Sequence, residues 1–159
     1  MEENEDQITY LTFVLNKELF AVDVSFVLEV LQNVSITEVP KTPEYIKGIA
    51  NFRGEIIPVV NTFKKFNLNE NSVNERNVIV MEVNVNGKQM KIGTTASGVR
   101  DVVTFDDKDI VPIPEIGAGY NIQFLQGAVK LDNRFVLVLN VNEIFSHDEI
   151  VILSNASES

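Results

Sequence analysis

Apolar side chains recur along the chain in short runs, and most runs are separated by residues that favour turns. Paired runs on either side of Gly, Asn or Asp predict antiparallel β-hairpins, because side chains alternate between the two faces of a strand. Gly54 and Gly87 would supply the positive φ that a tight turn needs. The predicted hairpins lie within residues 8–22, 49–60, 78–95 and 124–139, with turns at Asn16-Lys17-Glu18, Arg53-Gly54, Asn86-Gly87 and Asp132-Asn133.

Short helices are expected where a capping side chain precedes apolar residues. Asp23 or Ser25 is expected to cap a helix over residues 26–31. Thr42-Pro43-Glu44 combines a hydroxyl cap, a proline at the first helical position and an acid in the first turn, and Gly48 ends that turn. The other expected caps are Asn61, Ser97 and Asn140, the last of them at the start of a C-terminal helix.

The chain is predicted to be an internal duplication, because marker residues recur at equal spacing. Gly48 and Asn61 are 13 residues apart, and so are Gly127 and Asn140. The second half carries a seven-residue insertion around residues 117–123. Upstream, Val27-x-Glu29-Val30 matches Val99-x-Asp101-Val102. Two similar β-rich halves are therefore expected, each with its own small core.

Composition suggests where these halves begin and end. Residues 67–77 are rich in Asn and Glu and poor in large apolar side chains, which is typical of a linker. An end strand can cross from one half to the other, so the sequence halves need not be the spatial halves. The expected division is a disordered tail at 1–7, a first half at 8–70, a linker at 71–76, a second half at 77–150 and a C-terminal tail at 151–159.

Charge and composition narrow the classes of partner. The chain has 159 residues, is 45% hydrophobic and carries a formal net charge of −10, which disfavours nucleic acid and anionic membranes as direct partners. It has no cysteine, consistent with a reducing cytoplasm. The acidic N-terminus does not resemble a signal peptide, and no apolar run reaches the roughly 20 residues of a membrane span. Membrane association is therefore expected only through a partner.

Catalytic chemistry is not expected. The single histidine, His147, is interpreted as an exposed surface residue, and the chain has no phosphate-binding glycine loop and no nucleophile elbow. Asp106, Asp107 and Asp109 could form a metal or phospho-acceptor site, but a solvated acidic loop explains them more simply. We predict no enzyme activity, no metal and no cofactor.

The stretch Pro40-x-x-Pro43-x-Tyr45-Ile46-Lys47-Gly48-Ile49-x-Asn51-Phe52-Arg53-Gly54-x-Ile56-Ile57-Pro58-Val59-Val60 resembles the signature of the CheW family. These chemotaxis adaptors couple receptors to the histidine kinase CheA. The resemblance extends over about Ile8 to Ile150. It implies two small five-stranded β-barrels packed side by side, short helices at the barrel ends, a C-terminal helix and a hydrophobic groove between the barrels. It also implies a cytoplasmic protein recruited to membrane receptor arrays by its partners.

The resemblance assigns two surfaces. A groove for the hairpin tip of a chemoreceptor is implied at Val24, Val27, Glu29, Arg53 and Val99. A surface for the C-terminal regulatory domain of CheA is implied at Ile36, Val39, Tyr45, Ile46 and Ile56. Simple core packing remains open for each of these apolar residues.

Arg53 has two interpretations, an exposed turn residue or a partly buried partner of Glu29. If the pair is buried, Arg53→His would cost roughly 3–5 kcal/mol, and less if it is wet. CheW-like sequences usually carry Asp where this chain has Asn61, Ser97 and Asn140, and the exchange of one cap for another favours a structural role there.

Three other functions are weighed. A CheW paralogue of a twitching or gliding system would use the same surfaces. A detached kinase regulatory domain is disfavoured by the Met1 start and the absence of ATP-site motifs, and a fusion with a receiver domain by the short chain. A carbohydrate- or nucleic-acid-binding barrel is disfavoured by the charge and by the absence of Trp.

Overall fold

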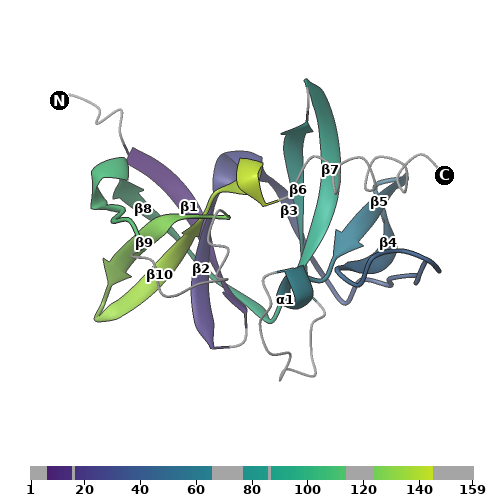
Figure 1. The fold of residues 1–159 in the computed structure, drawn as a ribbon, viewed down its shortest axis with the longest axis horizontal. Coiled ribbons are helices and arrows are strands. Elements are labelled where there is room, and N and C mark those ends of the chain that lie inside the picture. The colour runs from purple at the N-terminus through teal and green to yellow at the C-terminus, as the bar shows by residue number, and fades with distance from the viewer. Residues whose placement is uncertain (1–6, 16, 66–76, 86, 114–123, 145–159) are drawn as a thin grey trace.

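Two five-stranded β-sheets lie side by side in the computed structural model (Figure 1), which describes residues 7–15, 17–65, 77–85, 87–113 and 124–144. The sheet here called the β1 sheet contains β1 (Gln7–Leu15), β2 (Glu18–Asp23), β8 (Gly98–Asp106), β9 (Leu125–Leu131) and β10 (Arg134–Leu139). The β6 sheet contains β3 (Val27–Gln32), β4 (Ile46–Phe52), β5 (Glu55–Val60), β6 (Asn77–Val85) and β7 (Lys88–Ala96). The short helical elements are α1 (Thr62–Lys65) and the 3-10 turns η1 (Val24–Phe26), η2 (Asp107–Asp109) and η3 (Val141–Glu143). None of the helices in the described ranges is long and apolar enough to cross a lipid bilayer.

All four predicted hairpins are confirmed as antiparallel pairs: β1–β2, β4–β5, β6–β7 and β9–β10. The positive φ expected at Gly54 and Gly87 is confirmed, at 85° and 82°, and Asp132 and Asn133 of the last turn also have positive φ, 48° and 66°. A side-chain amide supports the first of these turns, because the Gly54 amide donates to Asn51 Oδ1 at 3.1 Å.

The helix predicted over residues 26–31 is wrong. Only η1 is helical, and the Ser25 amide donates to the Asp23 carboxylate at its start (2.8 Å). The chain then continues as β3, which pairs with β6. A helix of six residues is marginal on its own, whereas a ladder with β6 satisfies the backbone of β3 and suits its valines.

The other predicted caps have mixed outcomes. The Lys64 amide donates to Asn61 Oδ1 at the start of α1 (3.3 Å), as expected. Ser97 instead precedes strand β8, and Thr42-Pro43-Glu44 belongs to turns without a helix. Asn140 precedes the 3-10 turn η3 without a side-chain cap hydrogen bond. The C-terminal helix is therefore not supported up to Ile144, and its remainder lies outside the described residues.

The duplication is visible in the strand order, and the two copies are interlocked. The orders β8-β1-β2-β10-β9 and β3-β6-β7-β5-β4 are equivalent if β1 corresponds to β6. The first hairpin therefore lies among strands of the second half, and β6–β7 lies among strands of the first half. A boundary at residues 71–76 would not separate the two sheets, although those residues themselves lie outside the described ranges.

The predicted equivalences hold at the glycines but not upstream. Gly48 is opposite Val59 and Gly127 is opposite Val138, in equivalent hairpins. The match of Val27 with Val99 is wrong. Counted back from the ends of the β1–β2 and β6–β7 hairpins, Leu11 corresponds to Met81, and these residues pair with Val102 and Val27, respectively. At this position Val27 takes the place of Val102, and, one position on, Glu29 takes the place of Val103, because the two strands bulge at different points.

Each sheet has an apolar core of its own, as predicted, and a third core joins the two sheets. The core of the β1 sheet contains Tyr10, Ala21, Phe105, Val129, Val136 and Val138. The core of the β6 sheet contains Ala50, Phe52, Ile57, Val59, Val78 and Val80. The third, here called the seam core, includes Leu11, Phe13, Leu15, Phe20 and Val22 from one sheet and Ile79, Met81, Val83, Met90 and Ile92 from the other. Burial on both faces explains why the β1 and β6 sequences are apolar at consecutive positions.

The sheets are not closed barrels, which corrects that part of the predicted fold class. In each sheet the remaining gap is spanned by one isolated bridge and not by a continuous strand pair. Thr37, in the chain after β3, bridges to Ile49 of β4, and Val111, in the chain after β8, bridges to Ala128 of β9. Both bridges need the adjacent glycine. A Cβ at Gly48 would lie 2.2 Å from the Thr37 carbonyl oxygen, and one at Gly127 would lie 2.5 Å from the Val111 carbonyl oxygen.

Candidate interaction surfaces

One margin of the seam core carries apolar side chains that reach solvent. They come from η1, β3 and β8, which connect or border the two sheets, and we call them the crossover face: Val24, Val27, Leu28, Val99 and Val102. Val102 is 62% exposed and Leu28 44% exposed. Exposed apolar side chains that continue a buried core are typical of a docking surface.

Strand register shows which way two of these side chains project. Val27 pairs with Met81 of β6, and Val99 pairs with Phe13 of β1. Directly paired residues project from the same face of a sheet, and both partners belong to the seam core. Val27 and Val99 are therefore both half-buried against the seam core, one from each sheet.

Arg53 and Glu29 form the ion pair that was one of the two interpretations of Arg53. Arg53 Nη2 lies 2.5 Å and Nε 3.2 Å from Glu29 Oε1, so both bonds reach one carboxylate oxygen. The side chains are 74% and 34% exposed. The hydrogen bond to Glu29 raises the pKa of the Arg53 guanidinium, which stays charged. The Arg53–Glu29 pair is therefore exposed to solvent and not buried, and it links strand β3 to the β4–β5 turn.

The residues assigned to the kinase surface do not form one cluster. Ile36 packs against the core of the β6 sheet, and Tyr45 against the seam core, both half-buried. Val39 is half-buried in the segment between them. Ile46 is only 7% exposed within the seam core, so it offers no side chain to a partner. Ile56 is 46% exposed beside the Arg53-Gly54 turn, at the opposite end of β5 from Tyr45.

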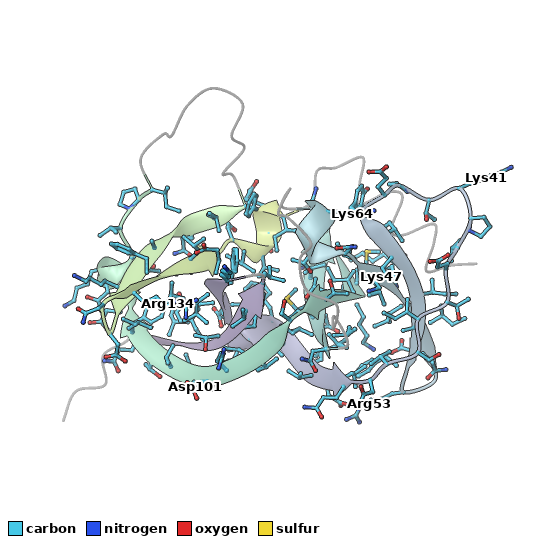
Figure 2. The ribbon with its side chains drawn as sticks, turned by 90° about the horizontal axis from the view of Figure 1, so that it is seen from below. Lys41, Lys47, Arg53, Lys64, Asp101 and Arg134 are labelled. Atoms are coloured by element: carbon cyan, nitrogen blue, oxygen red, sulfur yellow. The ribbon has the colours of Figure 1, made fainter. Side chains whose placement is uncertain are left out.

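The two surfaces lie on different edges of the molecule. Figure 2 shows Arg53 and Asp101, which belong to the β4–β5 turn and to β8, along one edge, and Lys41 and Lys64 along the opposite edge. Tyr45 lies near the second edge, because the amide of Asn61, the residue before α1, donates to the Tyr45 carbonyl oxygen (2.7 Å). One rigid body thus presents an apolar face beside β3 and β8 and a separate flank beside β4 and α1.

Leu28 and Val102 were missed by sequence reasoning. Both fall in segments that were predicted as helices, where they would have been placed on a packed face. Read as a strand, residues 98–106 alternate after Asp101 between exposed Val102, half-buried Val103, exposed Thr104 and buried Phe105. The sequence itself does not alternate between apolar and polar residues there, so the strand pairing was needed to identify them.

The acidic side chains of η2 accept hydrogen bonds from neighbouring groups. The Asp106 amide donates to Asp109 Oδ2 (3.1 Å), and Gln126 Nε2 donates to Asp107 Oδ1 (3.1 Å). Within the described ranges, no three His, Asp or Glu side chains gather as metal ligands. His147 lies outside those ranges.

Comparison with known proteins identifies one family. The model of the CheW-like domain matches residues 9–149. "Chemotaxis protein CheW" of Treponema pallidum is 28% identical over 98% of this chain and 92% of its own length. The protein of the same name from Klebsiella aerogenes is 28% identical over 94% of this chain and 89% of its own. The crystal structure of the scaffolding protein TtCheW from Thermoanaerobacter tengcongensis superposes with a TM-score of 0.76, at 30% identity, over 89% of this chain and 96% of that one.

Proposed function

This chain belongs to the CheW family, and from that premise we propose that it is a chemotaxis adaptor that couples chemoreceptors to the histidine kinase CheA. The observation that carries the proposal is the presence of two separate surfaces on two sheets joined by one seam core. A shared core makes the sheets move together, so a partner bound at one surface is held in a defined position relative to a partner at the other.

We place the receptor at the crossover face. Chemoreceptor tips are helical hairpins, and an amphipathic helix binds by laying apolar side chains into an apolar surface. Val27 and Val99 provide a half-buried floor, and Leu28 and Val102 provide exposed contacts around it. The Arg53–Glu29 pair adds fixed charges that would orient a polar helix face.

We place the C-terminal regulatory domain of CheA on the flank beside β4, at Ile36, Val39 and Tyr45. Tyr45 is the expected anchor, because aromatic side chains dominate the energetics of protein interfaces. Ile56 is left out of this contact, because it is exposed beside the Arg53-Gly54 turn at the other end of β5. The adaptor does no chemistry of its own in this scheme, and it acts in the cytoplasm, where partners recruit it to receptor arrays.

Two modest contacts are sufficient for such a role. Signalling interfaces of about 1,200–1,600 Å² or less exchange readily, and repetition in an array strengthens them through multivalency. Binding is therefore expected to be measurable with each partner alone and stronger with both.

The proposal is tested with the full chain and two fragments, a receptor cytoplasmic hairpin and the C-terminal domain of CheA. We expect each fragment to bind the chain separately, and both to bind simultaneously in one complex, as measured by co-purification and light scattering. Competition between the fragments, or failure of either to bind, would overturn the two-surface scheme.

Arg53→Ala separates the binding role of the Arg53–Glu29 pair from a structural role. Because the pair is exposed, we expect the melting temperature to fall by less than about 3 °C. Binding of the receptor fragment should weaken by about tenfold, since Glu29 would then face the receptor unpaired. Arg134→Ala is the matched control, because Arg134 follows the equivalent turn of the β9–β10 hairpin. Unchanged receptor binding by Arg53→Ala would remove the pair from the interface.

A further inference from the structure

Four lysines lie on the segments that flank Tyr45, namely the turn before β4, β4 itself and α1. Lys65 Nζ lies 5.1 Å from the centre of the Tyr45 ring, and Lys64 is its neighbour in α1. Lys47 follows Tyr45 by two residues, and Lys41 precedes it in an exposed turn with φ of 65°. Figure 2 shows Lys41, Lys47 and Lys64 on the β6-sheet half of the molecule. We call Lys41, Lys47, Lys64 and Lys65 the lysine set.

This set reverses the charge balance of the chain. The whole sequence has 13 basic and 23 acidic residues. The segments that carry the lysine set, residues 36–47 and 61–65, contain four lysines and only two acids, Glu38 and Glu44. Within the described part of the chain, neither Lys41 nor Lys64 has an ion-pair partner, whereas Arg53 and Lys91 are paired with Glu29 and Glu55.

We propose that the lysine set receives an acidic patch on the docking surface of the kinase, and that it steers and orients that contact. The inference rests on the proposed function, because it gives the chemistry of the partner at the Tyr45 flank. A chain with a net charge of −10 repels an acidic partner at long range, and a local excess of positive charge directs the approach to one place.

The composition of the flank favours an acidic protein over a polyanion such as nucleic acid or anionic lipid. Polyanions are bound by broad, uniformly basic surfaces. Here Glu38 and Glu44 are interspersed with the lysines, and half-buried Val39 and Tyr45 lie among them. Apolar anchors surrounded by charges of both signs are the pattern of a protein interface with a polar rim.

The test compares two double charge reversals that change net charge equally. Lys41→Glu with Lys64→Glu removes the exposed members of the lysine set. Lys17→Glu with Lys130→Glu is the matched control, because both residues are exposed, Lys17 in the β1–β2 turn and Lys130 in β9, away from the lysine set. Association and dissociation rates with the CheA C-terminal fragment are measured at about 50 mM and 500 mM salt, since salt screens exposed charges.

At low salt we expect the first variant to associate about tenfold more slowly than wild type and the control to stay within about twofold. At high salt the three proteins should associate at similar rates, and dissociation should change little throughout. Equal slowing by both variants, or no slowing by either, would overturn the inference while leaving the adaptor function intact. Binding of the wild type to vesicles with anionic lipid, lost in the first variant, would also overturn it. Absence of any binding between wild type and the kinase fragment would instead contradict the proposed function.

Discussion

Gly48→Ala is expected to destabilise the protein by about 4 kcal/mol, because the added methyl group would meet the backbone of a neighbouring segment. The new Cβ would lie 2.2 Å from the Thr37 carbonyl oxygen and 2.9 Å from Ile36 Cγ2. Thr37 and Ile49 exchange two backbone hydrogen bonds at 2.8 Å each, and the chain cannot retreat without breaking them. The free energy of unfolding, measured in urea, should fall accordingly.

Gly54→Ala is the matched control. Gly54 also has a positive φ, 85°, but nothing lies within 4 Å of its hypothetical Cβ. Only backbone strain is then expected, about 1–2 kcal/mol. Gly127→Ala should behave like Gly48→Ala, because the Val111–Ala128 bridge repeats the same close approach. If Gly48→Ala were no less stable than Gly54→Ala, the bridge would not hold the edge of the β6 sheet.

The contrast between the two glycines also shows which parts of the fold sequence reasoning can reach. Hairpins are local, so the turn at Arg53-Gly54 and the runs beside it contain all the information that their pairing needs. The equal spacing of Gly48 and Gly127 identified them as equivalent, but spacing does not reveal that a distant carbonyl group approaches each of them. That constraint comes from residues 11 to 16 positions earlier in the chain.

The errors at β3 and β8 have a common physical cause. Each segment is short, rich in valine and preceded by a good helix cap, so local propensity favours a helix or leaves the choice undecided. Strand β3 pairs with β6, and β8 pairs with β1, across about 50 and 90 residues of chain. Backbone hydrogen bonds to a partner so distant in sequence outweigh a single cap, and no local pattern contains them.

The sequence pattern also did not predict that the two halves exchange their first hairpins. Sequence spacing detected the duplication, but a repeat has the same spacing whether its first hairpin stays with its own half or joins the other. The seam core explains why each hairpin joins the other half. Phe13 of β1 and Met81 of β6, which are equivalent strands, both belong to the core between the sheets, so both hairpins are buried on two faces. Among the candidate site residues, the Arg53–Glu29 pair was predicted by family resemblance, whereas Leu28 and Val102 required the strand register.

Val102→Asp is expected to abolish binding of the receptor fragment without unfolding the protein. The Val102 side chain is 62% exposed, so a carboxylate there stays hydrated in the free protein, and the melting temperature should change by less than about 3 °C. Docking an apolar helix over it would bury that carboxylate without a partner. The penalty is about 2 kcal/mol or more, which corresponds to at least a 30-fold loss of affinity.

Val111→Asp is the control that makes this result specific. Val111 is the same residue type, is 50% exposed and lies after β8 beyond the crossover face, so the same substitution places the same charge elsewhere on the β1 sheet. We expect it to bind the receptor fragment as wild type does, and both variants to bind the CheA fragment normally, as measured by calorimetry with each fragment in turn.

Loss of kinase binding by Val102→Asp would mean that the two surfaces are not separate. Equal receptor binding by both variants would mean that the receptor docks away from β8. Because the seam core holds the two sheets as one body, a charge at Val102 has no route to the Tyr45 flank except through unfolding, which the unchanged melting temperature would exclude.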